Sequence, residues 1–269
     1  MKVLFVASEC SPFIKTGGLA DVIGSLPQAL KEEGVDVSVV LPKYDDFPCS
    51  FTDKAELKTS FTISLVWRKQ YCGIEVFKYK GIKYFLIDNE YYFKRSGLYG
   101  FHDEAERFTF FCKAVLEMLF HLDYKPDVLH CHDWQTAMIP VYLHSHYKDD
   151  PFYNNLKTVF TIHNIDYQGD FPYSVLKDIL GLDDRYFDSL EFYGRVNFMK
   201  GALNYADLIT TVSESYSREI RTPYFGKGLQ GLLQQRSDDL YGIVNGIDSE
   251  SYNPATDKHI FKNYERDVD

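Results

Sequence analysis

The sequence predicts an α/β fold, a doubly wound and mostly parallel sheet with helices on both of its faces. Val3–Ala7 is a continuous apolar run, as expected of a strand buried on both faces, and Val35–Leu41 is the next predicted strand. Between them, apolar residues recur at helical spacing from Leu19 to Leu30, and Gly34 ends that helix. The same alternation returns after Pro126, and strands that alternate with helices favour a doubly wound sheet.

The first of these units is a strand, a helix and a strand over about forty residues, with an expected right-handed crossover. The stretch 61–87 is different, because three strands follow one another with only short turns between them, such as Lys80–Gly81. We predict that these strands form a small antiparallel insertion or extra edge strands; they are Phe61–Trp67, Tyr71–Tyr79 and Ile82–Ile87.

The alternation of strands and helices resumes in the second half of the chain. A long helix is predicted at Glu104–Leu122, and the later elements are strands or helices of ordinary length. In chain order these are strand Val128–Cys131, helix Thr136–Ser145, strand Thr158–Ile162, strand Leu208–Val212, a helix that starts at Ser213, and strand Tyr241–Val244.

The pattern predicts one domain over residues 1–250. From Ser249 onward the sequence is polar and charged, so we expect residues 251–269 to be the start of a linker rather than a closing element of this domain.

Composition limits the class of protein. The net charge of -10 disfavours a nucleic-acid binder, although a small nucleotide can still bind in a locally positive cleft. There is no apolar run of membrane-spanning length. The five cysteines are widely spaced and form no CxxC pair, which favours a reducing compartment such as the cytoplasm.

The distinctive polar motifs fall at the carboxyl ends of predicted strands, where open α/β sheets bind their ligands. The first motif runs from Lys15 to Val22 and contains Gly17, Gly18 and Asp21. Two glycines admit a ligand close to the backbone, and the helix N-terminus and the lysine suit a diphosphate. The same residues also fit an ordinary strand-to-helix turn with a solvated lysine.

The second motif, His130 to Gln135, allows three interpretations. His130, His132 and Asp133 are types of metal ligand, but no further ligand at a suitable spacing completes a zinc site. The motif also fits a buried strand end capped by Asp133. In the third interpretation, a sugar site, Asp133 binds hydroxyl groups and Trp134 offers a stacking face.

Two further motifs end later strands. His163 and Asn164 follow Thr158–Ile162, and although a lone histidine is usually structural, the neighbouring asparagine and loop favour a ligand role. Asn245 and Gly246 predict a turn at the end of Tyr241–Val244.

Taken in this order, the motifs resemble the bacterial glycogen synthase and plant starch synthase family over essentially the whole chain. The Lys-Thr-Gly-Gly-Leu-Ala-Asp run at residues 15–21 is similar to the best-known signature of that family. The other similar segments are Ser8–Glu9, Tyr99–Gly100, Glu106–Phe108, His132–Trp134, His163–Asn164, Tyr167–Gly169, Thr211–Ser213, Phe225–Leu229, Gly231–Leu233 and Asn245–Asp248.

The resemblance implies two Rossmann-like domains that face each other across a cleft, the GT-B arrangement. It implies retaining transfer of glucose from ADP-glucose to the non-reducing end of an α-1,4-glucan or maltooligosaccharide, with no metal and no cofactor. The compartment would be the bacterial cytoplasm, or the plastid stroma in a plant. Members of the family are nearly twice as long, so we expect this chain to be the N-terminal, acceptor-side half and to be inactive alone.

The resemblance also implies roles for individual residues. Lys15, Gly17 and Gly18 would lie at the donor phosphates, with Asp21 in the same motif, and Asp133 and His163 would meet the transferred glucose. His163 would act through its side chain or its own carbonyl group. The acceptor side would be lined by Glu9, Tyr99, Trp134 and Asn164, with Asn245 near the domain hinge.

Three other functions compete with this one. A sucrose synthase or another glycosyltransferase would share the architecture, but the motifs at Lys15 and His132 favour the glycogen and starch group. A non-catalytic glucan-binding module is the second. A metal-dependent hydrolase built on His130, His132 and Asp133 is the third.

Overall fold

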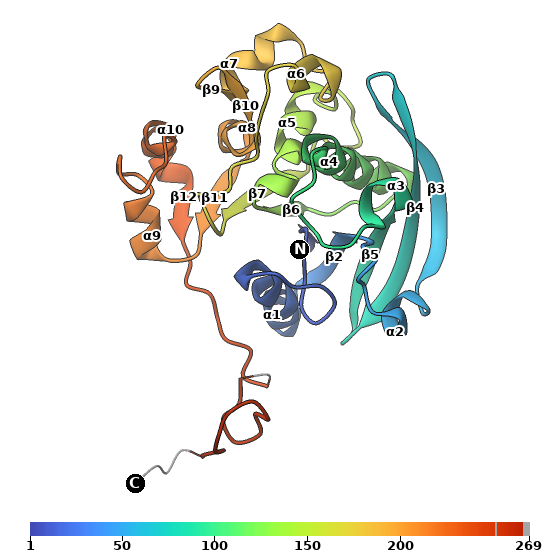
Figure 1. Ribbon diagram of the computed structural model, residues 1–269, viewed down its shortest axis with the longest axis vertical. Coiled ribbons are helices and arrows are strands. Elements are labelled where there is room, and N and C mark those ends of the chain that lie inside the picture. The colour runs from blue at the N-terminus through green and yellow to red at the C-terminus, as the bar shows by residue number, and fades with distance from the viewer. Residues whose placement is uncertain (251, 266–269) are drawn as a thin grey trace.

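The computed structural model describes residues 1–250 and 252–265, and a mixed sheet lies at its centre (Figure 1). The strands of this sheet in spatial order are β12-β11-β7-β6-β1-β2-β5-β4-β3, parallel from β12 to β5 and antiparallel from β5 to β3. Their bounds are β1 Lys2–Val6, β2 Asp36–Pro42, β3 Glu56–Leu65, β4 Arg68–Tyr79, β5 Ile82–Asp88, β6 Val128–His132, β7 Lys157–Ile162, β11 Leu208–Thr211 and β12 Leu240–Gly242.

A second, smaller antiparallel sheet has the order β8-β10-β9. Its strands are β8 Asp170–Phe171, β9 Glu191–Phe192 and β10 Arg195–Asn197. The α-helices are α1 Gly18–Glu32, α2 Cys49–Thr52, α3 Glu90–Phe93, α4 Glu104–His121, α5 Met138–Ser145, α6 Val175–Asp178, α7 Phe187–Leu190, α8 Phe198–Tyr205, α9 Glu214–Glu219 and α10 Gln230–Gln235.

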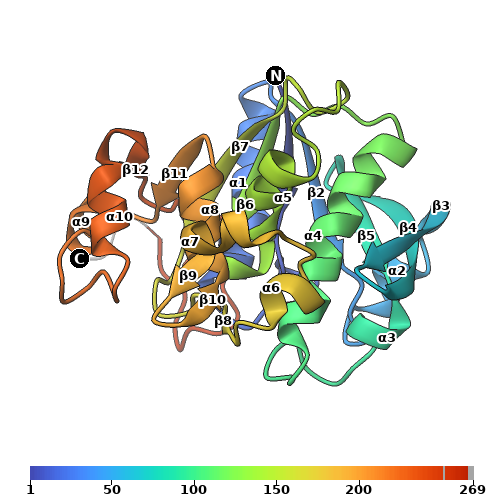
Figure 2. The ribbon, with the colours of Figure 1, turned by 90° about the horizontal axis from the view of Figure 1, so that it is seen from above.

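Two hydrophobic cores lie on opposite faces of the main sheet. Successive side chains of a strand point to opposite faces, so Val3 and Phe5 join the core under α1, whereas Leu4 and Val6 join the core under α4, α5 and α8. Figures 1 and 2 show α1 on the other side of the sheet from those three helices. Burial on both faces explains why Val3–Val6 of β1 is a continuous apolar run.

The predicted fold class is confirmed, including the antiparallel strands around 61–87. The parallel strands place the loops after β1, β6, β7 and β11 at one edge of the sheet, which is where the predicted motifs lie. No helix among residues 1–250 and 252–265 is long and apolar enough to cross a membrane.

Several element boundaries were wrong. β3 begins at Glu56, five residues before the predicted strand, because its first half is an exposed edge without an apolar signal. Trp67 belongs to the hairpin turn after β3 and is 73% exposed. The predicted helix at 136–145 begins instead as a short 3₁₀ turn at Trp134–Thr136, followed by α5.

The last predicted strand, Tyr241–Val244, was wrong at its end. β12 stops at Gly242, Ile243 and Val244 are exposed, and residues 243–248 form neither a strand nor a turn. The Asn245–Gly246 turn is therefore not formed. The predicted linker 251–269 includes residue 251 and residues 266–269, which lie outside the described residues, and residues 252–265 contain no helix or strand.

Candidate active site

A cleft of about 710 Å³ lies at the carboxyl ends of the parallel strands. It brings together nine of the predicted site residues from loops that are far apart in the sequence. These nine are Glu9, Gly17, Gly18, Tyr99, Asp133, Trp134, His163, Asn164 and Asn245. The structure therefore supports one shared site for them, while the role of each residue remains a prediction.

Glu9 holds the glycine-containing loop in place at one wall of the cleft. Its side chain is buried and accepts hydrogen bonds from the backbone N–H groups of Thr16 and Gly17 and from the Thr16 hydroxyl. The Tyr99 hydroxyl donates to the same carboxylate at 3.1 Å. Glu9 thus ties the loop before α1 to the loop before α4, and its oxygens are engaged with the protein.

Gly17 and Gly18 leave open space at the start of α1. A Cβ atom built on either glycine would meet no other atom within 4 Å, so packing within the chain does not require glycine here. Gly17 is the N-cap residue and gives α1 no side-chain cap. A helix start with bare backbone on the wall of a cleft suits the close approach of an anionic group.

Lys15 and Asp21 lie outside the main cleft, which the sequence did not predict. The Lys15 ammonium donates to both carboxylate oxygens of Asp21, at 2.7 and 2.8 Å. This hydrogen-bonded pair raises the pKa of Lys15 above its ordinary value. Both residues line an adjoining depression together with Gly246 and Tyr252. A phosphate-binding role for Lys15 remains a prediction. Phosphates bound by Lys15 would lie toward this depression.

Asp133 links the ends of β6 and β7. Its Oδ1 accepts the His163 N–H at 2.8 Å, and its own N–H donates to the Thr161 carbonyl at 3.0 Å. The Asp133 backbone has φ of 56°, an unfavourable value for a residue other than glycine, and such strain is concentrated at functional sites. Burial raises the pKa of the Asp133 carboxyl group to about 7, against the opposing effect of backbone N–H donors.

This raised pKa makes a testable prediction for Asp133→Asn. Between pH 4 and pH 7 the unfolded chain has released a proton that folded Asp133 retains, so Asp133 lowers the free energy of unfolding progressively as pH rises. Asparagine keeps an acceptor oxygen for the His163 N–H without a charge. We expect the Tm of the variant minus that of the wild type to increase from pH 4.5 to pH 7.5.

The buried histidines have the opposite effect on the pH dependence of stability. Because they are present in both the wild type and Asp133→Asn, the difference in Tm between the two proteins isolates the effect of Asp133. Burial lowers the pKa of His163 to about 4 and that of His130 to about 3, and their contribution to stability rises with pH up to about 6.5. A Tm difference that is constant with pH would contradict the raised pKa of Asp133.

His163 lies at the end of β7 and lines the cleft. Its Nε2 is 3.0 Å from Nδ1 of His132, whose ring is completely buried. Because its pKa is about 4, the His163 imidazole is neutral at pH 7 and suits a positioning role better than proton transfer. In residues 1–250 and 252–265, no three His, Cys, Asp or Glu side chains are arranged to hold a metal ion.

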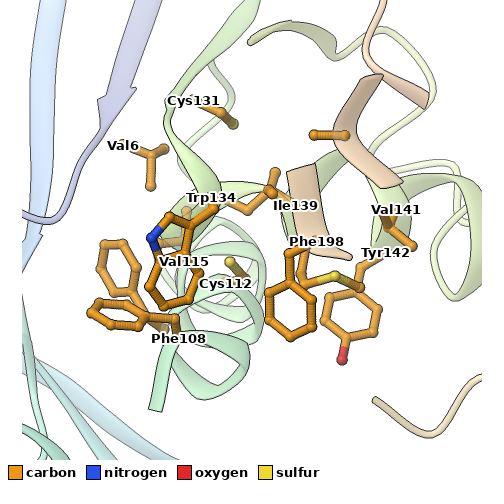
Figure 3. Packing of buried hydrophobic residues seen from close by; sticks show 14 of the residues in the cluster. Val6, Phe108, Cys112, Val115, Cys131, Trp134, Ile139, Val141, Tyr142 and Phe198 are labelled. Atoms are coloured by element: carbon orange, nitrogen blue, oxygen red, sulfur yellow. The ribbon is translucent and has the colours of Figure 1, made fainter. Parts of the chain in front are cut away.

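Trp134 borders the cleft but is mainly a core residue. It is 6% exposed and packs edge-on against Phe108 and Phe171, and Figure 3 shows the indole beside Phe108. A Cβ atom on Gly169 would lie 2.6 Å from the indole, so Gly169 is required for this packing. Stacking of a sugar on Trp134 therefore remains a prediction with little exposed ring to support it.

Sequence reasoning missed Glu104, which also lines the cleft. In the first turn of α4, its Oε1 accepts the backbone N–H of Gly100 and shapes the loop that carries Tyr99. The available signal was an acidic residue at the start of a predicted helix, four residues after a glycine.

Comparisons with known proteins identify the family of the chain. The model of a family described as "Starch synthase catalytic domain" matches residues 2–235. The chain is 57% identical over 270 residues to a glycogen synthase of Desulforamulus reducens and 53% identical over 266 residues to one of Alkaliphilus metalliredigens. These alignments cover 100% and 98% of this chain and 56% of each relative, so the chain spans little more than half their length.

A solved starch synthase structure is also similar to this chain. The catalytic domain of Starch Synthase IV from Arabidopsis thaliana, bound to ADP and acarbose, superposes with a TM-score of 0.88 at 34% identity. The match covers 98% of this chain and 55% of the Arabidopsis chain.

Proposed function

The chain belongs to the family of starch synthase catalytic domains, and on this basis we propose that it is the acceptor-side half of a glucosyltransferase. The donor is ADP-glucose, and the acceptor is the non-reducing end of an α-1,4-glucan. The observation that carries the proposal is the cleft in which the loops after β1, β6 and β7 bring Gly18, Asp133 and His163 together. ADP and acarbose in the related Arabidopsis structure support a nucleotide donor and a sugar acceptor.

The geometry supports a division of the cleft between donor and acceptor. The uncapped start of α1 and the adjoining Lys15 suit the diphosphate, because backbone N–H groups and an ammonium stabilise the negative charge that develops as the C1–O bond breaks. Asp133 and His163 lie across the same cleft and suit the hydroxyl groups of the transferred glucose. Glu9, Tyr99 and Asn164 border the space left for the acceptor.

Transfer with retained configuration needs the donor, the acceptor and the protein groups held in one geometry, and such positioning supplies much of the barrier reduction. We assign no metal and no cofactor to the reaction, and we place it in the cytoplasm. Asn245, on the exposed segment after β12, would lie at the hinge toward the remaining half of the enzyme.

We expect the 269-residue chain alone to transfer no glucose, because it spans about 56% of the length of its relatives. The measurement is incorporation of labelled glucose from ADP-glucose into glycogen. The control is a full-length polypeptide carrying this N-terminal sequence, which should incorporate glucose from ADP-glucose faster than from UDP-glucose. Sustained incorporation by the short chain would disprove the need for the second half, and an inactive full-length polypeptide would disprove the proposed function.

A further inference from the structure

A completely buried histidine, His132, lies directly behind His163. Its Nδ1 is 3.0 Å from His163 Nε2, which is a hydrogen-bonding distance between two ring nitrogens. Its other nitrogen, Nε2, is buried and has no hydrogen-bond partner in the part of the chain that the structure describes. One of the two rings must donate the proton in the shared hydrogen bond, so the two tautomers are coupled.

The surroundings of His132 decide which ring donates. The Phe5 ring is nearly parallel to the His132 ring, with an interplanar angle of 14° and a centroid distance of 5.4 Å. The His130 ring lies 4.1 Å away at 32°. Ring N–H groups point along the plane of their own ring, so neither stacked neighbour offers the face of its π system to Nε2 of His132.

The two possible tautomers therefore have different costs. If Nε2 of His132 carried the proton, a buried N–H would be left without an acceptor, which is rare in folded proteins. If Nδ1 carries the proton, the N–H is satisfied by His163, and only a bare lone pair remains at Nε2. The tautomer with the proton on Nδ1 therefore leaves no hydrogen-bond donor unpaired and is favoured.

We propose that His132 is a positioning residue that donates its Nδ1–H to Nε2 of His163 and so fixes the proton of His163 on Nδ1. Neutral His163 then presents Nδ1–H as a donor, and no residue in the described ranges 1–250 and 252–265 accepts it. Because the ring borders the cleft, its partner is an acceptor atom of the ligand, such as the oxygen of a sugar hydroxyl group. This last step rests on the proposed function, whereas the tautomer does not.

The proposal also explains why His163 is unsuited to proton transfer. A proton on Nε2 of His163 would meet the N–H of His132, so the imidazolium form is disfavoured in addition to the effect of burial. The titratable groups near the pair include His130 on β6 and, at the cleft, the carboxyl groups of Asp133, Glu9 and Glu104. None of these carboxyl groups accepts a hydrogen bond from either imidazole ring, and Oδ1 of Asp133 accepts the backbone N–H of His163.

Nuclear magnetic resonance tests the tautomer directly. The 269-residue chain is labelled with ¹⁵N-histidine, and long-range ¹H–¹⁵N correlations distinguish rings protonated at Nδ1 from rings protonated at Nε2. We expect both His132 and His163 to be protonated at Nδ1 at neutral pH, with signals assigned from single substitutions. A His163 ring protonated at Nε2 would overturn the proposal whether or not the proposed function is correct.

A matched pair of variants tests the positioning role in the full-length enzyme. His132→Asn places an amide N–H near the position of Nδ1, whereas His132→Leu has nearly the same shape and no donor. We expect the Leu variant to lower kcat by about tenfold with KM little changed, and the Asn variant to retain most of the activity. Equal activity of the two variants would overturn the positioning role.

Thermal unfolding of the same variants excludes a purely structural role. Leucine at position 132 suits the apolar contact with Phe5. The Tm of the Leu variant should therefore equal or exceed that of the Asn variant, while the kcat of the Leu variant is lower. A fall of kcat that only follows the loss of folded protein would refute the proposal. If the Leu variant does not fold, His132→Gln replaces it, because its amide reaches the position of Nε2 and leaves the position of Nδ1 without a donor.

Discussion

In the full-length enzyme, Lys15→Ala is expected to lower kcat/KM by ~10²-fold or more, as for the loss of one preorganised electrostatic group. The Lys15 ammonium is fixed by two contacts with Asp21 beside the open start of α1. A fixed cation helps most where negative charge develops, which in the proposed reaction is the departing diphosphate. Steady-state kinetics at varied ADP-glucose concentration measure the effect.

Two controls separate charge from shape at this position. Lys15→Gln keeps most of the length of the side chain without the charge. Its kcat/KM should fall nearly as much as that of Lys15→Ala. Lys31→Ala removes an exposed lysine from the last turn of the same helix and should change kcat/KM little. If Lys15→Gln restored most of the activity, the charge assignment would be wrong.

The largest expected effect on stability is that of Arg107→Ala, about 3–5 kcal/mol in the free energy of unfolding. The Arg107 side chain is completely buried, and its Nε and Nη1 donate to the carbonyl oxygens of Tyr92 and Leu98. The rings of Phe101 and Phe108 pack around the guanidinium. Alanine would leave two carbonyl groups unpaired and open a large cavity beneath the loop that carries Tyr99.

Equilibrium denaturation of Arg107→Ala and Arg107→Met measures this effect. Methionine keeps much of the volume of arginine and removes a charge whose burial is itself costly. The free energy of unfolding should therefore fall clearly less in Arg107→Met than in Arg107→Ala. Arg95→Ala is a comparison with a partly exposed arginine, because the Arg95 side chain is 20% exposed in its ion pair with Asp103, and it should cost clearly less than Arg107→Ala. An Arg107→Ala protein within 1 kcal/mol of the wild type would show that the buried guanidinium contributes little.

The elements that could be predicted are those with a strong periodic signal. β1 and β2 lie between other strands with both faces covered, and burial explains why most of their residues are apolar. The small sheet β8-β10-β9 was missed because strands of two or three residues are too short to show any period. The first half of β3 was missed because one of its edges and much of its surface face solvent.

The site was partly predictable for a geometric reason. Parallel strands end at the same edge of a sheet, so Asp133 and His163 were expected at one edge, and the pairing of β6 with β7 makes them neighbours. Their hydrogen bond, with Oδ1 of Asp133 accepting the N–H of His163, depends on φ of 56° at Asp133, a backbone angle that the sequence pattern did not reveal.

By itself, the sequence determined the sheet, its antiparallel extension and the edge at which the motifs gather, because strand periodicity and chain order are local properties. Only the tertiary structure decided which polar groups pair: Glu9 with the loop at Thr16, Lys15 with Asp21, and His132 with His163. Hydrogen bonds depend on distances of about 3 Å and on direction, and chain segments far apart in sequence reach that precision only when the whole fold is packed.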